Sequence, residues 1–287
     1  MKKIIYLLIL STTSLFGQTG VGNLIAHYSF DGNCNVETTY EDINNGIPFG
    51  NPEYATGING EPNSAIRIKN NSEDTTYVDL GNNNTYNFNS TSAFSISLWV
   101  KTIDNDGFRC ILVKGDDDYN QWDYGVIIDE NGKPYTGTHG LNVVSEKPID
   151  NGQWNHLVAT YDNGLYKLFV NNIFEVSLTG TKISQSDGRL ILGKKGDANY
   201  TYYNGLVDEL KIFSKALNAI EVTQLFNERN CVASFESITD GKEVTFDNTT
   251  EGTYTHVQYN YGDGNFSNNS DSHSHTYEQD GIYEVCI

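Results

Sequence analysis

The stretch Tyr203-Asn-Gly-Leu-Val-Asp-Glu-Leu-Lys-Ile-Phe213 alternates like a β-strand, yet it carries an acid among its apolar positions. Simple alternation puts Asp208 on the same face as three apolar side chains, those of Leu206, Leu210 and Ile212. An ionised carboxylate that is buried without a partner is very costly in free energy. We therefore expect Asp208 to lie beside a cation or several hydrogen-bond donors.

A helix start follows this strand directly. Asn218 can cap the first turn, and Glu221 stands three residues later, where its side chain can reach back to the cap. Leu217 and Val222 occupy the two positions of a hydrophobic staple. The pattern predicts a short helix that runs to about Phe226 and closes a first domain.

Short strands rich in aromatic and β-branched residues dominate the rest of the chain, with turns of Asn, Asp and Gly between them. Regularly spaced strands with a single helix predict an all-β sandwich. The polar segment 34–63 is longer than an ordinary connection, which is typical of functional or ligand-fixed loops. The strands are expected at 24–30, 65–68, 77–80, 94–101, 110–113, 124–128, 154–161, 166–170, 173–178, 190–193 and 203–213.

The N-terminal residues have the pattern of a secretory signal peptide, because two lysines precede an apolar run and then a small-residue region. We expect residues 1–17 to be removed on export, so that the protein is secreted or displayed on the cell surface. No later stretch is long or apolar enough to cross a bilayer. The formal charge of −19 becomes −21 without the two lysines of the leader, which argues against nucleic acid and anionic membranes as partners.

The chain has four cysteines, Cys34, Cys110, Cys231 and Cys286. An oxidising compartment favours disulfides, so two bridges are expected, and all three connectivities are open. The four residues are too widely spaced for a zinc motif.

Five segments carry, in order, a resemblance to a known family. They are Tyr28-Ser-Phe-Asp-Gly-Asn33, Phe94-Ser-Ile-Ser-Leu-Trp-Val-Lys101, Gln153-Trp-Asn-His-Leu-Val-Ala-Thr-Tyr161, Leu168-Phe-Val-Asn-Asn172 and Asn204-Gly-Leu-Val-Asp-Glu-Leu-Lys-Ile-Phe213. Together they make residues 22–229 resemble the laminin G-like jelly-roll family of concanavalin A-like sandwiches. The resemblance implies a jelly roll of two packed sheets.

The pattern changes after Cys231. The runs Tyr261-Gly-Asp-Gly264, His275-Thr-Tyr277 and Gly281-Ile-Tyr-Glu-Val285 make residues 232–287 resemble the polycystic kidney disease (PKD) domain, a small immunoglobulin-like sandwich. In that family the first two motifs are structural, and the last strand continues further. We therefore expect a C-terminally incomplete PKD-like domain, with further domains in a longer chain. A bridge between Cys231 and Cys286, near the two ends of this domain, is a further hypothesis.

The sequence lacks the acids that catalysis on this fold would need. Glucanases of the jelly-roll fold carry alternating acids, close to Glu-x-Asp-x-x-Glu, which place a nucleophile and an acid on one face. Here Asp116, Asp117 and Asp118 are consecutive, so their side chains alternate in direction. The six histidines lie near no serine or cysteine in a nucleophile motif. We predict that this chain is not an enzyme.

The loop that follows residue 114 combines aromatic rings with carboxylates and amides. A sugar rests its apolar face on an aromatic ring, and its hydroxyls need hydrogen-bond partners. We predict a site for a polysaccharide or glycoprotein made by Asp116, Asp118, Tyr119, Asn120, Trp122 and Tyr202. The alternative, that these aromatic side chains only pack onto the sandwich, stays open.

These patterns predict a secreted or cell-surface binding or adhesion protein. One alternative is the non-catalytic binding region of a larger secreted polysaccharide-degrading enzyme whose catalytic module is missing from this chain. Another makes both domains structural spacers in a surface protein.

The family resemblance also implies a structural calcium ion, Ca2+, that ties the closing strand to the end of the first strand and to the loop after it. The matching positions are Asp31, Asp42, Gly46 and Asp208. Calcium takes about six to eight oxygen ligands from carboxylates and backbone carbonyls, and the Asn- and Gly-rich loop 41–46 can supply such carbonyls. The alternative is that Asp208 accepts hydrogen bonds from backbone amides of that loop without a metal.

Overall fold

The structure, a computed structural model, describes residues 6–8, 21–40, 42–69, 75–104, 107–115, 122–180, 186–195, 202–228, 235–250, 257–285 and 287. The chain divides into two compact units, a larger one of Val21–Phe226 and a smaller one that combines Met1–Gly20 with Asn227–Ile287. Both are built almost entirely from strands, which confirms the predicted all-β fold class.

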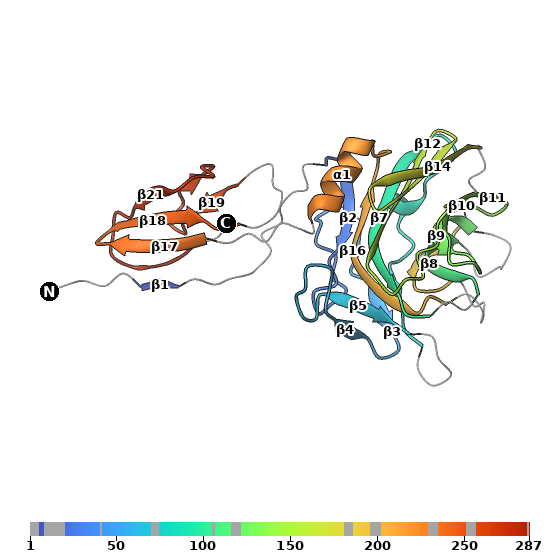
Figure 1. Cartoon of the computed structure of the whole chain (residues 1–287), viewed down its shortest axis with the longest axis horizontal. Helices are drawn as coiled ribbons and strands as arrows, with labels where there is room; N and C mark the ends of the chain where they lie inside the picture. Colours follow the sequence, from blue (N-terminus) through green and yellow to red (C-terminus); the bar gives the residue numbers. More distant parts are fainter. Residues whose placement is uncertain are drawn as a thin grey trace. The chain divides into compact units, whose positions relative to one another are not determined.

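One layer of the larger unit is an antiparallel sheet, which has seven strands among the described residues (Figure 1). Its order is β11-β10-β9-β8-β15-β6-β3, so β11 and β3 are its edges. The strands are β3 (Ile47–Phe49), β6 (Tyr77–Asp79), β8 (Arg109–Gly115), β9 (Trp122–Ile128), β10 (Pro134–Thr138), β11 (Leu141–Val144) and β15 (Arg189–Leu192).

The second layer is an antiparallel sheet with eight strands among the described residues, and it faces the first layer in Figure 1. Its order is β14-β13-β12-β7-β16-β5-β4, and β2 also pairs with β16. The strands are β2 (Leu24–Tyr28), β4 (Glu53–Ala55), β5 (Ala65–Ile68), β7 (Ala93–Thr102), β12 (Asn155–Asp162), β13 (Leu165–Val170), β14 (Ile173–Thr179) and β16 (Gly205–Phe213).

Apolar side chains from alternate strand positions fill the space between the sheets. Leu98 of β7 and Val126 of β9 are fully buried in this core. A short 3-10 helix, η1 (Asn84–Tyr86), closes one end, where the hydroxyls of Tyr86 and Tyr28 lie 3.1 Å apart. The hydrophobic effect, about 25 cal/mol per Å² of apolar surface, is thus the main force that holds the two layers together.

β16 is the predicted closing strand, and the predicted inward face was right for Leu210 and Ile212 but wrong for Asp208. A β-bulge follows Asp208, where Glu209 has a φ of +51°. Val207 before the bulge and Leu210 after it both belong to the core. Asp208 instead pairs with Trp99 on the outer side of the sheet, although it is buried as predicted. The extra residue of the bulge shifts the alternation, and alternation alone cannot reveal it.

The predicted helix is α1 (Ala219–Glu228), and it covers part of the outer face of the eight-stranded sheet (Figure 1). Asn218 Oδ1 accepts the N–H of Glu221 at 3.1 Å, and Glu221 Oε2 accepts the N–H of Asn218 at 2.9 Å. This reciprocal pair confirms the predicted capping box. Val222 and Leu225 bury the apolar side of the helix against the sheet.

The smaller unit contains an antiparallel sheet of β17, β18 and β21, and a separate hairpin of β19 and β20. β1 pairs in parallel with β22. The strands are β1 (Tyr6–Leu8), β17 (Phe235–Asp240), β18 (Glu243–Asn248), β19 (Tyr259–Asn260), β20 (Phe266–Ser267), β21 (His273–Thr276) and β22 (Ile282–Glu284).

The residues of the predicted PKD motifs pack together in the smaller unit. The rings of Tyr261 and His275 stack with centroids 4.0 Å apart, and His275 Nε2 lies 2.7 Å from Asp263 Oδ2. Tyr277 is fully buried, and its hydroxyl donates to the carbonyl of Tyr261 at 3.0 Å. These contacts give the motifs a structural role.

Several expectations fall largely outside the described residues. The predicted leader, residues 1–17, is described only at 6–8 and stays a prediction. Cys231 and Cys286 are not described, so their bridge is also still a prediction, whereas Cys34 and Cys110 are buried in two separate hydrophobic clusters. In the described part of the chain, no helix has the length and apolarity to span a membrane.

Candidate functional site

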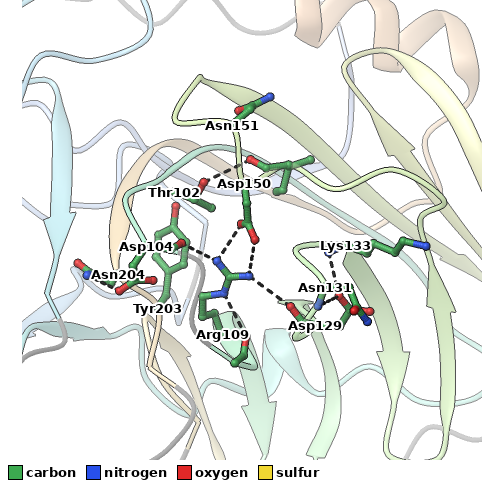
Figure 2. Close-up of polar contacts among 12 residues, drawn as sticks. Thr102, Asp104, Arg109, Asp129, Asn131, Lys133, Asp150, Asn151, Tyr203 and Asn204 are labelled. Carbon is green, nitrogen blue, oxygen red and sulfur yellow. Dashed lines mark hydrogen bonds and ion pairs between the residues drawn. The ribbon is translucent and has the colours of Figure 1, made fainter.

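A buried arginine organises one end of the sandwich (Figure 2). Arg109, at the start of β8, is 1% exposed and binds both carboxylate oxygens of Asp150 at 2.8 Å. Its other contacts are carbonyl oxygens, at 2.6 Å for Asp104, 3.2 Å for Gly107 and 3.3 Å for Asp129. All three guanidinium nitrogens are therefore engaged, which fixes the position of Asp150.

The β9–β10 turn is built to fit against Asp150. Asp129 Oδ1 accepts the backbone N–H groups of Asn131 and Lys133, each at 2.9 Å. Gly132 has a φ of +77°, and a Cβ atom at this position would lie 2.2 Å from Asp150 Oδ2. Glycine is required here on both counts, because a side chain would strain the turn and displace the carboxylate.

An open pocket of about 330 Å³ lies between this turn and the segment that carries Asp150. Its lining is polar, with two carboxylates and two amides, and consists of Glu130, Asn131, Pro148, Asp150 and Asn151. The volume falls within the range of about 300–1,000 Å³ that is usual for small-molecule sites. Carboxylates accept hydrogen bonds and amides both donate and accept, so this surface suits a ligand with many hydroxyl groups.

The pocket is better suited to holding a ligand than to catalysis. Both oxygens of Asp150 already accept hydrogen bonds from Arg109, which leaves this carboxylate little capacity to act as a nucleophile or general acid. A serine–histidine contact exists elsewhere, where Ser97 Oγ lies 2.8 Å from His156 Nε2. Both residues are buried, and the ring of Trp99 stacks on His156 at 4.7 Å, so a substrate has no direct access.

Asp208 forms a second polar centre, on the outer side of the eight-stranded sheet. It is 3% exposed, and its Oδ2 accepts the N–H of Ile58 at 2.8 Å. Gly57 lies so close that a Cβ atom there would be 2.5 Å from Asp208 Oδ2. Burial raises the pKa of Asp208 to about 8, and the charge of Glu209 contributes, whereas the Ile58 hydrogen bond opposes the rise.

The neighbouring Glu209 is held by two cationic side chains. Its Oε2 lies 2.9 Å from His27 Nε2 and 2.7 Å from Lys211 Nζ. His27 Nδ1 in turn lies 3.0 Å from Glu37 Oε2. Burial lowers the pKa of His27, but hydrogen bonds to Glu209 and Glu37 outweigh it and raise the value to about 9. His27 therefore carries a positive charge at neutral pH.

Replacing His27 with glutamine should have an effect that depends on pH. The folded-state pKa is above the ordinary value of 6.5, so the stabilisation is fully present below 6.5 and is lost as pH rises through about 9. We expect His27→Gln to lower the free energy of unfolding by roughly 2 kcal/mol at acidic to neutral pH and by little in alkali. Urea unfolding of both proteins across this range measures the difference, and a constant difference would contradict the ion-pair assignment.

The four residues predicted to bind calcium lie in different surroundings, and Asp208 is buried whereas Asp31 is exposed. Partial desolvation still raises the pKa of Asp31, and its charge contributes to the raised pKa of Asp208. Asp42 is exposed, and Gly46 packs against Val78 of β6 and donates its N–H to the carbonyl of Cys34 at 2.7 Å. In the described part of the chain, no group of three or more His, Cys, Asp or Glu side chains is arranged to hold a metal.

The loop beside Asp208 is therefore 57–64, and the assignment to loop 41–46 needs correction. Ser64 of this loop also lies close to Gly57, with its Oγ 3.1 Å from the Gly57 nitrogen. The reason is strand order, because β5 follows this loop directly and pairs with β16 through Ile66 and Val207. The sequence contains both strands, but it does not state which strands are neighbours.

Four residues of the predicted sugar-binding site lie outside the described part of the chain, namely Asp116, Asp118, Tyr119 and Asn120. Trp122 is 5% exposed and packs in a cluster with Tyr135, whose ring centroid is 6.5 Å away. Tyr202 is partly buried and forms an isolated β-bridge with Cys110. Trp122 thus takes the packing role that the sequence left open, and its ring offers no face to a sugar.

Sequence reasoning missed two features. The first is the Arg109–Asp150 ion pair, whose two residues are 41 positions apart in the sequence, together with the pocket beside it. The only local sequence signal for this site was the glycine-containing turn at 129–133. Phe49 and Tyr77 form the second feature, a stacked aromatic pair at the β3 edge with centroids 4.6 Å apart. The apolar triplet Ile47-Pro-Phe49 inside a polar segment was the available signal for that pair.

Family comparison agrees with this architecture. The family model described as "Concanavalin A-like lectin/glucanases superfamily" matches residues 71–223, which is more than half of the chain. The chain belongs to this superfamily. A second model, described as "PKD domain", matches residues 230–287. Both resemblances drawn from the sequence motifs are thereby confirmed.

Solved structures with a similar fold include a domain in complex with a sugar and the binding domain of a toxin. Domain 4 of AbnA, an extracellular GH43 arabinanase of Geobacillus stearothermophilus solved with arabinotriose, has 26% identity and a TM-score of 0.55. The match covers 71% of this chain and 98% of that one. The binding domain of botulinum neurotoxin serotype D/C has 15% identity and a TM-score of 0.56, with coverage of 87% and 69%, so it shows likeness of fold alone.

Two curated toxins are also similar in sequence. Botulinum neurotoxin type X of Clostridium botulinum is 27% identical over 179 residues, which is 58% of this chain. Paraclostridial mosquitocidal protein 1 of Paraclostridium bifermentans is 26% identical over 205 residues, or 62% of this chain. The matches span only 13% and 16% of these two relatives.

Proposed function

We propose that this chain is a secreted or cell-surface protein that binds carbohydrate without modifying it, as a free polysaccharide or as the glycan of a glycoprotein. The observation that carries the proposal is the open polar pocket over the Arg109–Asp150 pair, on a fold of the concanavalin A-like lectin/glucanases superfamily. The fixed carboxylate needs no reordering when a ligand arrives, and such preorganisation favours affinity.

A second candidate function is the non-catalytic binding region of a larger polysaccharide-degrading enzyme. The likeness to domain 4 of an extracellular arabinanase favours it, since that match covers nearly the whole of the arabinanase domain. Both candidates assign the same binding activity to this chain. They differ in whether a longer natural chain includes a catalytic module, which sequencing of the gene and its neighbours decides.

A structural calcium ion forms the second part of the proposal. Asp208 and Asp31 would hold it, together with backbone carbonyls of the 57–64 loop, and the ion would neutralise the charge of Asp31, which now contributes to the raised pKa of Asp208. Oxygen-only donors of this kind suit a hard cation. The ion would tie β16 to the end of β2 and to that loop.

The binding proposal is tested with the purified whole chain. A glycan array, followed by affinity electrophoresis in gels that contain arabinan and other neutral or acidic polysaccharides, gives both ligand class and relative affinity. We expect at least one polysaccharide to retard the protein. The carbohydrate-binding proposal would be overturned if the protein migrated equally in gels with and without polysaccharide and the glycan array gave no signal.

Removing the side chains of Glu130 and Asn131 together should weaken binding by about tenfold, because roughly two hydrogen bonds to ligand hydroxyls are lost. Both residues are exposed, and Asn131 contributes to the turn through its backbone N–H, so folding should be preserved. The matched control is Glu278→Ala with Gln279→Ala, an exposed acid–amide pair in the smaller unit. Equal retardation of test and control variants would show that the pocket is not the ligand site.

A further inference from the structure

The edge strand β3 exposes two large apolar side chains at neighbouring positions on one face. Ile47 is 64% exposed and Phe49 is 57% exposed. Side chains two residues apart on a strand lie about 7 Å from each other, so the two form a short apolar strip. Exposed apolar surface of this kind, when it is contiguous and rimmed by polar groups, marks binding sites.

The ring of Phe49 is held in a fixed orientation. It stacks on the opposite residue of β6, Tyr77, with centroids 4.6 Å apart and planes inclined by 18°. Lys194 Nζ lies 4.1 Å from the centroid of the Tyr77 ring, so the ammonium occupies the ring face that Phe49 leaves. Tyr77 is thus enclosed on both faces, and the outer face of Phe49 is the one that remains for a ligand.

A polar pair borders the strip. Ile47 lies opposite Asp79 of β6, and Arg189 Nε lies 2.5 Å from Asp79 Oδ2. Arg189 is half exposed, so hydrogen-bond donors and acceptors are available beside the apolar surface. The charges of Asp79 and Arg189 cancel each other, and Lys194 is buried against Tyr77, so the exposed surface favours an uncharged partner over an anionic or cationic one.

We propose that Ile47, Phe49 and the Asp79–Arg189 pair form a second carbohydrate subsite, which takes a neutral sugar ring of a polysaccharide. The inference rests on the proposed carbohydrate-binding function and adds a location and a sugar class to it. The apolar face of the sugar stacks on Phe49, and its hydroxyls bond to the polar pair. A strand from another protein fits this edge less well, because Pro48 lacks the N–H that strand addition needs.

The strip and the pocket can serve one long chain. β3 is one edge of the seven-stranded sheet, whereas the pocket adjoins the β9–β10 turn, several strands away. A polysaccharide long enough to reach both sites would bind them at the same time, and its overall affinity would exceed that of either site alone. We therefore expect polymers to bind more tightly than trisaccharides of the same sugar.

The test measures retardation by a neutral polysaccharide that the wild-type chain binds. Phe49→Ala should weaken retention about five- to tenfold, which corresponds to the value of one aromatic stacking contact. Phe49→Tyr keeps a ring and should retain binding, and Phe49→Leu keeps apolar bulk without a ring and should lose it. The matched control is Phe174→Ala, since Phe174 is 52% exposed on β14, at the edge of the other sheet. Thermal melting of each variant verifies the fold.

Four outcomes separate this inference from the proposed function. The subsite is supported if Phe49→Ala and Phe49→Leu lose retention while Phe49→Tyr and Phe174→Ala keep it. Retention unchanged by Phe49→Ala, with the wild type still bound, overturns the subsite but leaves carbohydrate binding in place. A wild type that no polysaccharide retards overturns both. If Phe49→Ala changes only the association state measured by analytical ultracentrifugation, the strip is a contact between two copies of the chain. This result would overturn the subsite.

Discussion

Arg109→Ala should lower the free energy of unfolding of the larger unit by about 3–5 kcal/mol, the usual cost of breaking a buried ion pair by removing one partner. Arg109 is almost fully buried, and its removal leaves Asp150 and three backbone carbonyls without their donor. For a unit of about 200 residues, this loss lowers the melting temperature by roughly 10 °C. The effect should extend to function, because Asp150 lines the pocket.

Tryptophan fluorescence can follow this unit separately, since all three tryptophans, Trp99, Trp122 and Trp154, belong to it. The control is Arg189→Ala, because Arg189 is half exposed and its surface ion pair is worth only about 0–1 kcal/mol. Arg109→Lys retains the charge but not the planar fork, so it should recover only part of the loss. Similar melting of the Arg109 and Arg189 variants would contradict the organising role of Arg109.

The sequence predicted features that depend on local patterns. The capping box at Asn218 and Glu221 formed as expected, because both partners lie within one helical turn. The tandem motifs placed both families correctly, since each motif records a strand or turn that the fold needs. Burial of Asp208 was also predicted, from its position in an otherwise apolar strand.

Features that depend on distant contacts were not predicted. Because of the bulge at Glu209, Asp208 lies on the outer side of its sheet, and no residue type at this position predicted the bulge. The order of strands brought the 57–64 loop to Asp208, and Trp122 was covered by Tyr135 from the next strand. In each case the surroundings of the side chain depend on a residue from another strand. The sequence indicates where the strands are, but it does not indicate which strands pair with each other.

Asp208 is the residue for which a bound ion would matter most. A carboxyl group whose pKa is raised to about 8 is mostly protonated at neutral pH. Folding must then take up a proton at a group whose ordinary pKa is 3.8, which destabilises the folded state. A calcium ion that binds only the folded state would offset this cost and add its own binding free energy. At a calcium concentration about a thousandfold above the dissociation constant, this stabilisation is about 4 kcal/mol.

A chelator should therefore lower the melting temperature of the larger unit by roughly 10 °C, and added calcium should restore it. Asp208→Asn should lose most of this response. In chelator it should melt no lower than the wild type, because the amide oxygen can still accept the Ile58 N–H and folding no longer requires a buried carboxyl group to bind a proton. Asp42→Asn is the matched control, since Asp42 is exposed and should keep the full response. Differential scanning fluorimetry in calcium and in chelator measures the melting temperatures of all three proteins.

If chelator leaves the melting temperature of the wild type unchanged, the site holds no exchangeable calcium. The backbone hydrogen bond from Ile58 would then be what stabilises Asp208 in its buried position.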